Sequence, residues 1–343
     1  MAIVASCFKI RLSPGVPPLP QGVARKPGNP KTPMHLRKRL IPPVLFLGAA
    51  SLAGAAASPP EERFSQPDYW KHVFTRDTCV DYPILFVHGI GTGFDDWRPT
   101  ASALSGSTHW RMRYNGDGEL VSNYLGGDPA PRNSIWNVSY YHDTPVKEAF
   151  GGNLTKYARR LERIVDAVKR ITKRDKVVLI CHSMGGLVAR GYMARSDENW
   201  ESVHKIVTVA TPNEGVGTAV GVVGQLRDLR KGSEFITGLN TAWRRRIREG
   251  YAGWGVVGAV DIGEDADVAP EALRDETDSG GVGFIKFSSA IPFGEWKAAA
   301  GARFGEPARD TPHFGYRVAI RGEHKAILDS PAVFRAILWA LSP

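Results

Sequence analysis

The chain has 343 residues, a formal net charge of +9 at pH 7 and three cysteines. This length allows a full-sized hydrophobic core, and one domain is the natural count once a leader is set aside. Residues 1–57 hold eight basic side chains and no acidic ones, so removing these eight charges leaves the rest of the chain at +1. No basic stripe with interleaved aromatic residues is left to suggest nucleic-acid binding.

The N-terminal leader has the three parts of a secretion signal. Residues 34–39 begin with Met34 and are basic, residues 40–52 are apolar, and residues 53–58 are small enough for cleavage. We therefore expect an exported protein, secreted or periplasmic, whose translation starts near Met34.

This interpretation divides the chain into three parts. We expect residues 1–33 to be an upstream or disordered extension, residues 34–57 to be the signal peptide, and residues 58–343 to form one folded domain. The alternative is a membrane anchor that the mature protein keeps. Pro42-Pro43 interrupts the apolar run, which then fades into alanine and glycine, so the run is short and weak for a membrane span and cleavage is favoured.

The first clear strand of the mature part is expected at residues 83–87. This apolar run leads into the glycine-rich loop His88-Gly89-Ile90-Gly91-Thr92-Gly93. Residues 135–141 alternate enough for another strand, and residues 153–171 carry apolar side chains at three- and four-residue spacing, which predicts a helix packed on a sheet. Strands that alternate with helices in this way predict a mainly parallel sheet.

Residues 177–190 carry the most informative pattern in the chain. Their apolar first part predicts a strand buried on both faces, and their last part is typical of a helix start. Ser183 stands at the tight turn between them, where a hydroxyl is lifted from the sheet and faces a helix N-terminus. Gly185 is one of the small residues that this turn needs, and Cys181 stands where the commoner G-x-S-x-G pattern has glycine. The alternative is a glycine-rich turn without chemistry.

A further strand is expected downstream, because residues 316–321 predict a strand that ends near His324. A helical segment, residues 330–341, follows this histidine.

In chain order, one strand leads into a His-Gly loop, a second strand leads through a serine into a helix, and a third strand leads through a loop to a histidine. This order resembles that of the α/β-hydrolase superfamily. More narrowly, the elbow His182-Ser183-Met184-Gly185-Gly186 and the Thr-Pro-x-x-Gly turn at residues 211–215 are similar to those of serine esterases and lipases. The resemblance covers residues 83–341 and implies a mainly parallel sheet flanked by helices. It also implies that residues 215–253 form a cap-like insertion over the pocket. Residues 243–248 within it are basic and are interpreted as a solvated helix face, with an anionic interface as the alternative.

The chemistry of that superfamily gives roles to four residues. Ser183 would be the nucleophile and His324 the general base. The backbone N–H groups of Ile90 and Met184 would hold the oxyanion. This chemistry needs no cofactor.

The carboxylate that orients the base is expected between the nucleophile and the base in chain order. Lipases of this type often carry Asp-Gly before an apolar pair, and Val282 stands in the place of that Asp here. Asp278, in a glycine-rich turn four residues earlier, is the nearest carboxylate and our assignment. Asp261 and Asp267 in the same acidic loop are the alternatives.

Cysteine and histidine spacing indicates neither a disulfide nor a metal site. Cys79 and Cys181 are the cysteines of the predicted mature chain, and Cys181 is committed to the elbow. His88 and His182 are interpreted as packing and hydrogen-bonding residues.

Together these patterns predict a monomeric serine hydrolase that cleaves carboxylic esters, as an esterase or a triacylglycerol lipase-like enzyme. The expected substrate is a small-molecule or lipid ester, with transient contact to a membrane or lipid interface and no nucleic-acid partner. Acyl transfer, amide hydrolysis and thioester hydrolysis use the same residues and stay as alternatives. A non-catalytic binding protein on this scaffold is less expected, because it would have lost the serine or the histidine.

Overall fold

The computed structural model describes residues 8–10 and residues 80–343, the latter with gaps at residues 106–108, 127–133, 145–146, 149–150, 218–223, 261–284 and 301–303. The described residues belong to one compact unit, and residues 13–62, which are assigned to a second unit, lie outside the description. The predicted signal peptide and all three candidate acids, Asp261, Asp267 and Asp278, also lie outside the described residues.

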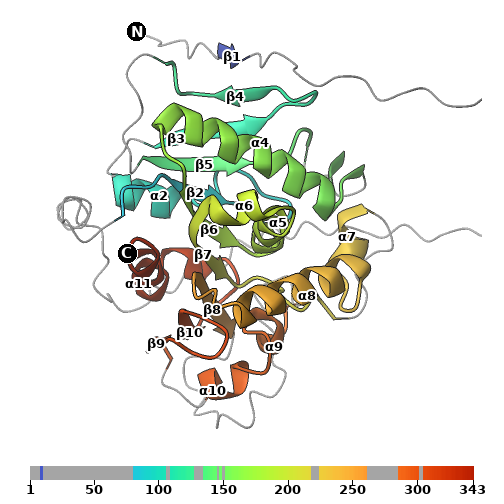
Figure 1. Cartoon of the computed structure of the whole chain (residues 1–343), viewed down its shortest axis with the longest axis vertical. Coiled ribbons are helices and arrows are strands. Elements are labelled where there is room, and N and C mark those ends of the chain that lie inside the picture. The colour runs from blue at the N-terminus through green and yellow to red at the C-terminus, as the bar shows by residue number, and fades with distance from the viewer. Residues whose placement is uncertain are drawn as a thin grey trace, which may run out of the picture. The chain divides into compact units, whose positions relative to one another are not determined.

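The described strands form one ten-stranded sheet (Figure 1). Its spatial order is β1 (Phe8–Ile10), β4 (Leu120–Ser122), β3 (Trp110–Tyr114), β5 (Ile135–Ser139), β2 (Ile84–Val87), β6 (Val177–His182), β7 (Val203–Val209), β8 (Trp254–Val260), β10 (Tyr316–Arg321) and β9 (Ala308–Arg309). The strands from β3 to β10 in this order are parallel neighbours, and the pairs β1–β4, β4–β3 and β9–β10 are antiparallel. The predicted mainly parallel α/β-hydrolase sheet is therefore confirmed.

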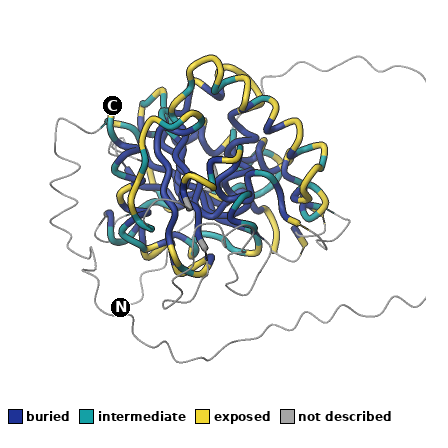
Figure 2. The backbone as a smooth tube through the Cα atoms, turned by 90° about the horizontal axis from the view of Figure 1, so that it is seen from below, coloured by how far each residue is buried: buried dark blue, intermediate teal, exposed yellow. Residues whose placement is uncertain are grey.

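Helices cover both faces of this sheet. Figure 1 shows α4 (Leu154–Thr172), α5 (Met184–Met193) and α8 (Glu234–Arg248) on the near face, and their buried residues join one hydrophobic cluster. α2 (Arg98–Ser105) and α11 (Pro331–Ala340) contribute to a separate cluster on the other face. Covered on both sides, the central strands are buried along their whole length, as Figure 2 shows for the inner part of the tube.

The helix α4 illustrates how the sequence forms one layer. Its predicted span, residues 153–171, differs from the observed helix by one residue at each end. The side chain of Asn153 accepts a hydrogen bond from the backbone N–H of Lys156 and caps the helix, and Lys173 ends it with a left-handed φ of 54°. The apolar stripe is buried against the sheet, as its spacing predicts.

The segment expected to form a cap, residues 215–253, contains α7 (Gly224–Asp228) and α8. α8 packs on the sheet as one of its covering helices, because Ile236, Leu239 and Trp243 are buried in the same cluster as α4 and α5. The ring of Trp243 lies 4.5 Å from that of Trp254 in β8. α7 is linked to the loop after β2 through the hydroxyl of Tyr141, which bonds both Gln225 and Gly91.

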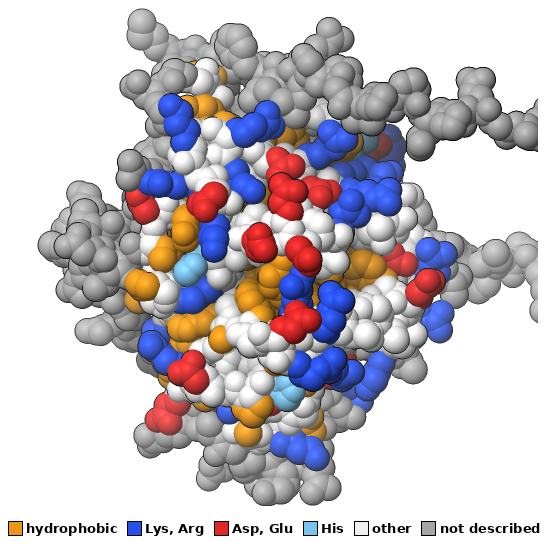
Figure 3. Space-filling model, viewed as in Figure 1, with side chains coloured by type: hydrophobic (Ala, Val, Ile, Leu, Met, Phe, Trp, Pro, Cys, Tyr) orange, Lys and Arg blue, Asp and Glu red, His pale blue; other side chains and the backbone are white. Residues whose placement is uncertain are grey.

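Smaller elements complete the described part of the chain: α6 (Asp197–Glu201), α9 (Phe287–Ala290), α10 (Trp296–Ala300) and the 3-10 turn η1 (Ala326–Asp329). None of the helices in the described ranges has the length and apolar character that a bilayer span requires. Figure 3 shows acidic and basic side chains interspersed over the face that carries α4 and α8.

Candidate active site

Ser183 occupies the turn between β6 and α5. Its φ of 51° and ψ of −129° are unusual for a residue with a side chain, and such strained angles persist only where the surroundings enforce them. The backbone N–H of Ser183 donates to the carbonyl of Val209 at the end of β7, at 2.9 Å. The turn therefore has the strand–serine–helix geometry that the sequence predicts.

Two glycines after Ser183 allow this turn to form. A Cβ on Gly185 would overlap the carbonyl oxygen of His88, and a Cβ on Gly186 would overlap the side chain of Thr211. α5 can therefore approach the ends of β2 and β7 only because both positions lack a side chain. Cys181 is fully buried with a free thiol, and burial raises the pKa of this thiol well above its usual value. It packs in the elbow, as expected.

The His-Gly loop after β2 runs directly against Ser183. A Cβ on Gly89 would lie 3.0 Å from the Cβ of Ser183. The N–H of Gly89 donates to the Asp96 carboxylate at 3.0 Å, and the N–H of Gly91 donates to the Tyr141 hydroxyl at 3.2 Å. The Tyr141 hydroxyl in turn donates to the side-chain oxygen of Gln225 in α7, at 3.2 Å.

Two backbone donors near Ser183 have no acceptor among the described residues. Within the described part of the chain, the N–H groups of Ile90 and Met184 make no hydrogen bond. Ile90 follows the glycine that contacts Ser183, and Met184 is the first residue of α5, where the helix dipole favours negative charge. These are the two donors that the sequence analysis selected for an oxyanion.

His324 follows β10 and lies at the elbow. Its carbonyl oxygen accepts a hydrogen bond from Nε2 of His182 at 3.0 Å, and the centroids of the two rings are 4.6 Å apart. Because His182 precedes Ser183 in the chain, the loop that carries His324 is fixed to the residue next to the serine. Ser183 and His324 are 4% and 5% exposed, so both lie in a largely enclosed site.

Asp96 is a member of this cluster that the sequence analysis did not select. Its side chain is 3% exposed, and Oδ2 accepts from Nδ1 of His182 at 2.7 Å as well as from Gly89. Trp97 holds this position by donating its indole N–H to the carbonyl of Val87 at 3.0 Å. Two features of the sequence could have indicated this contact: an Asp-Asp-Trp sequence after the His-Gly loop, and a histidine directly before the serine.

Burial alone would raise the pKa of the Asp96 carboxyl. The hydrogen bond and charge of His182, together with the Gly89 N–H, outweigh burial and hold the pKa of Asp96 well below its usual range. Burial lowers the pKa of His182, against the opposing pull of the Asp96 carboxylate. Burial also lowers the pKa of the neighbouring His88, to about 4.

A cavity of about 820 Å³ opens beside this cluster. Its walls come from the His-Gly loop, the end of β5 and the residues that follow His324. Its lining is mixed: Phe94, Pro99 and Leu328 are apolar, and the polar side chains include Thr92, Ser139, Tyr141, Arg113, Asp143 and Asp329.

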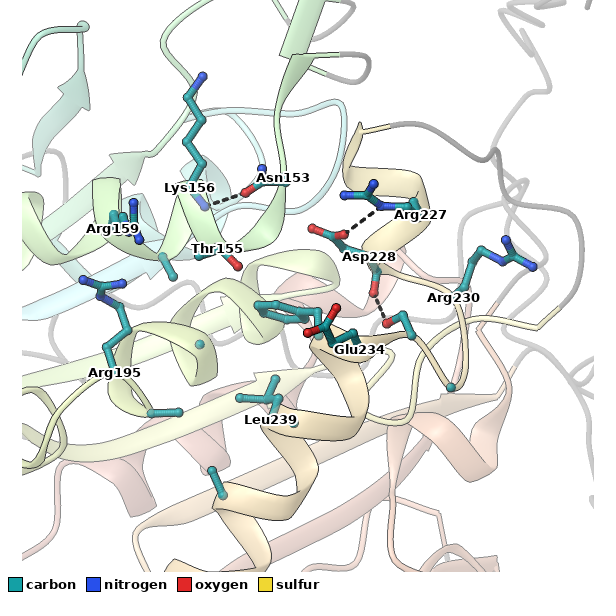
Figure 4. Close-up of a pocket in the computed structure, with 18 of the residues that line it drawn as sticks. Asn153, Thr155, Lys156, Arg159, Arg195, Arg227, Asp228, Arg230, Glu234 and Leu239 are labelled. Atoms are coloured by element: carbon teal, nitrogen blue, oxygen red, sulfur yellow. Dashed lines mark hydrogen bonds and ion pairs between the residues drawn. The ribbon is translucent and has the colours of Figure 1, made fainter. Parts of the chain in front are cut away.

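A larger hollow of about 1160 Å³ lies between α4 and α8 (Figure 4) and is called here the α4–α8 groove. It is lined by the first turns of α4 and α8 and by the last turn of α5, roughly 15 Å along α5 from Ser183. Asp228 lies at its centre, and its carboxylate accepts from the N–H of Leu154 at 3.0 Å and pairs with Arg227 at 3.5 Å. In the described chain, no metal-binding group of His, Cys, Asp or Glu side chains is found.

Comparisons with known proteins agree with this architecture. A family model described as "PGAP1-like alpha/beta domain" matches residues 79–262. A Candida albicans protein named GPI inositol-deacylase is 32% identical over 133 residues, which are 38% of this chain and 31% of that protein. The chain thus matches less than a third of the length of this relative.

Two solved structures are similar at low identity. The product of the gene lin2722 from Listeria innocua is 15% identical with a TM-score of 0.48, and the match covers 76% of this chain and 93% of that one. The Bacillus licheniformis lipase BlEst2 is 14% identical with a TM-score of 0.43, covering 78% and 94%. Because the family match spans more than half of its length, the chain belongs to the PGAP1-like alpha/beta domain family, within the α/β-hydrolase superfamily.

Proposed function

We propose that this protein is a serine hydrolase that cleaves carboxylic esters through an acyl-enzyme on Ser183. One observation carries the proposal: a strained serine lies between two unpaired backbone N–H groups of the described chain, beside a loop that carries a histidine. Donors fixed around a nucleophile before substrate binds can stabilise the charge that develops on an ester oxygen.

The reaction would proceed in two halves. His324 would accept the Ser183 proton as the hydroxyl oxygen attacks the ester carbonyl, and the N–H groups of Ile90 and Met184 would hold the resulting oxyanion. Collapse of this intermediate would break the bond to the alcohol, which leaves with the proton from His324. Water would then attack the acyl-enzyme with the same histidine as base and release the acid.

Asp278 is our candidate for the acid that orients His324, and it lies outside the described residues. Asp278→Asn should lower turnover by about 10⁴-fold, because an amide can hold the wrong tautomer of the histidine. Asp261→Asn and Asp267→Asn are the matched controls from the same loop and should have small effects. If one of these two is the crippling change, the triad stands and the assignment moves to that residue.

The cavity beside the site favours an ester whose alcohol part carries several hydroxyl groups. Carboxylate and hydroxyl groups in its walls, such as those of Asp143 and Ser139, can accept further hydrogen bonds from the hydroxyl groups of a substrate, and an apolar alcohol would cover them without such bonds. The name of the Candida albicans relative describes removal of an acyl group from inositol. An acylated inositol is therefore the substrate class that we propose for this chain.

The test is an assay of the purified domain on p-nitrophenyl esters of graded acyl length and on acyl-inositol. We expect hydrolysis of both classes, with higher kcat/KM for acyl-inositol than for an acyl ester of a simple aliphatic alcohol. A fluorophosphonate probe should label Ser183, and Ser183→Ala should abolish labelling and turnover while keeping the fold. Full turnover by the alanine variant would refute the mechanism, and equal kcat/KM for both alcohols would refute the substrate class.

Export through the leader is part of the same proposal. Expression from Met34 should give a protein whose mass corresponds to a new N-terminus between residues 55 and 60. An intact leader on soluble protein, found by mass spectrometry, would count against export.

A further inference from the structure

The two ring nitrogens of His182 both face hydrogen-bond acceptors. Nδ1 lies 2.7 Å from the Asp96 carboxylate, and Nε2 lies 3.0 Å from the backbone carbonyl of His324. A carbonyl oxygen cannot donate, so Nε2 must carry a proton. Hydrogen bonds and the charge of His182 hold the pKa of the Asp96 carboxyl well below its usual range, so it is ionised and its Oδ2 accepts from Nδ1 as it does from Gly89.

His88, in the same site, provides an internal comparison. Its Nδ1 donates to the carbonyl of Gly89 at 2.7 Å, and its Nε2 accepts from the hydroxyl of Ser139 at 3.1 Å. One donor and one acceptor satisfy a neutral imidazole, which agrees with the pKa of about 4 that burial gives this ring. The surroundings of His182 differ because neither partner offers a proton in this arrangement.

We propose that Asp96 and His182 form a buried pair with no net charge, a carboxylate and a doubly protonated imidazolium, which positions the loops around Ser183. Both side chains are almost fully enclosed, at 3% and 2% exposure. An isolated charge at this depth would be costly, whereas a pair whose hydrogen bonds are all satisfied is tolerated.

Burial and hydrogen bonding act in opposite directions on His182. Burial is the largest influence and lowers its pKa, whereas the hydrogen bond and charge of Asp96 and the backbone carbonyl of His324 raise it; the titratable groups that face it are Asp96, His88 and His324. His88 stays neutral, so the carboxylate of Asp96 is the charge that dominates this surrounding. A neutral His182 would point a lone pair at an acceptor 2.7 or 3.0 Å away, and we infer from these two contacts that the repulsion exceeds the cost of burying a neutralised pair.

The pair connects three segments that the proposed reaction needs. Asp96 holds the Gly89 N–H and so fixes the turn that carries the Ile90 donor. His182 is the neighbour of Ser183, and its Nε2–H holds the backbone of His324. Asp96 and His182 are thus positioning residues, and this role rests on the proposed function, whereas the protonation of the pair does not.

The protonation is tested on the wild-type protein by nitrogen-proton correlation NMR of the histidine side chains. We expect both ring nitrogens of His182 to carry protons at pH 7, while His88 shows one protonated and one unprotonated nitrogen. Assignment would come from His182→Gln and, independently, from through-bond correlation to the backbone. A single protonated nitrogen on His182 at pH 7 would overturn the proposal whether or not the protein hydrolyses esters.

The positioning role is tested with Asp96→Asn. The amide can donate to Nδ1, so His182 should become neutral in the spectrum, and kcat should fall about 10- to 100-fold with KM changed by less than about threefold. The rate constant for fluorophosphonate labelling should fall in parallel. Asp197→Asn is the matched control, because Asp197 is 78% exposed and pairs with Arg246 on the surface, far from the site; its kcat should stay unchanged.

The two proposals fail in different ways. If the wild-type protein neither turns over esters nor labels at Ser183, the proposed function fails, and the NMR result still decides the state of the pair. If the wild type is active and Asp96→Asn keeps its kcat and labelling rate, the positioning role fails alone.

Discussion

The Ser183 cluster, formed by Ser183, His324, His182 and Asp96, and the α4–α8 groove both contain paired charges, but the two regions differ in how far these charges are buried. The cluster encloses Asp96 and His182 almost completely and gives each of them more than one hydrogen bond. The groove leaves Arg227 63% exposed against Asp228 at 3.5 Å. Water screens the second pair and has little access to the first, so the two pairs differ in interaction energy although their formal charges are equal.

The groove is also the larger hollow, at about 1160 Å³ against about 820 Å³ beside the cluster. Size therefore does not indicate where the chemistry is. A strained serine, unpaired backbone donors among the described residues and desolvated charges occur together only in the cluster. The predictions below test whether the two regions differ in function as they do in burial.

His324→Gln should give the largest effect. Without a base beside Ser183, turnover should fall by at least about 10³-fold, and the midpoint of thermal unfolding should stay within a few degrees. His204→Gln is the matched control, because His204 lies near the start of β7, at the opposite end from Ser183, and contacts the carbonyl of Ser342 at 2.9 Å. Ester hydrolysis with both variants measures the difference, and comparable activities would contradict the assignment of the base.

A pair of glycine substitutions sharpens the comparison between the regions. Gly185→Ala should lower the free energy of unfolding by about 3 kcal/mol, because the new Cβ would overlap the carbonyl of His88. Gly238→Ala in the groove should raise it by about 0.5–1 kcal/mol, because open space surrounds this helical position. Urea unfolding measures both, and a tolerated alanine at 185 would mean that α5 can move away from β2.

Acid should weaken the cluster before it affects the groove. The pKa of His88 is about 4 in the folded protein and 6.5 when unfolded, so its contribution is complete above pH 6.5 and is lost as the pH falls from 6.5 to 4. The loss amounts to about 3 kcal/mol, since each pKa unit corresponds to about 1.4 kcal/mol. Urea unfolding at pH 7 and pH 5 captures about 2 kcal/mol of this loss, and His88→Gln should flatten the dependence. An unchanged slope would show that another group causes it.

The sequence was sufficient for the parts of the site that depend on local pattern. The helix α4 and the elbow at Ser183 follow from the spacing of apolar and small residues within about twenty positions. The Asp96–His182 contact joins residues 86 positions apart, and the contact from His182 to His324 spans 142. Such pairings depend on which strands become neighbours, and a single sequence does not give that order.

The smallest effect is expected for a surface ion pair beside the groove. It tests whether exposed charges there interact as weakly as their exposure predicts. Arg195 pairs with Glu162 at 3.1 Å, and the two side chains are 32% and 27% exposed. A double-mutant cycle of Arg195→Gln and Glu162→Gln should give a coupling free energy of about 0.5 kcal/mol. It should shrink further at 1 M salt, where the screening length is about 3 Å. Turnover should not change in either variant. A coupling above about 2 kcal/mol would mean that this pair is as desolvated as the Ser183 cluster, and the contrast between the two regions would then fail.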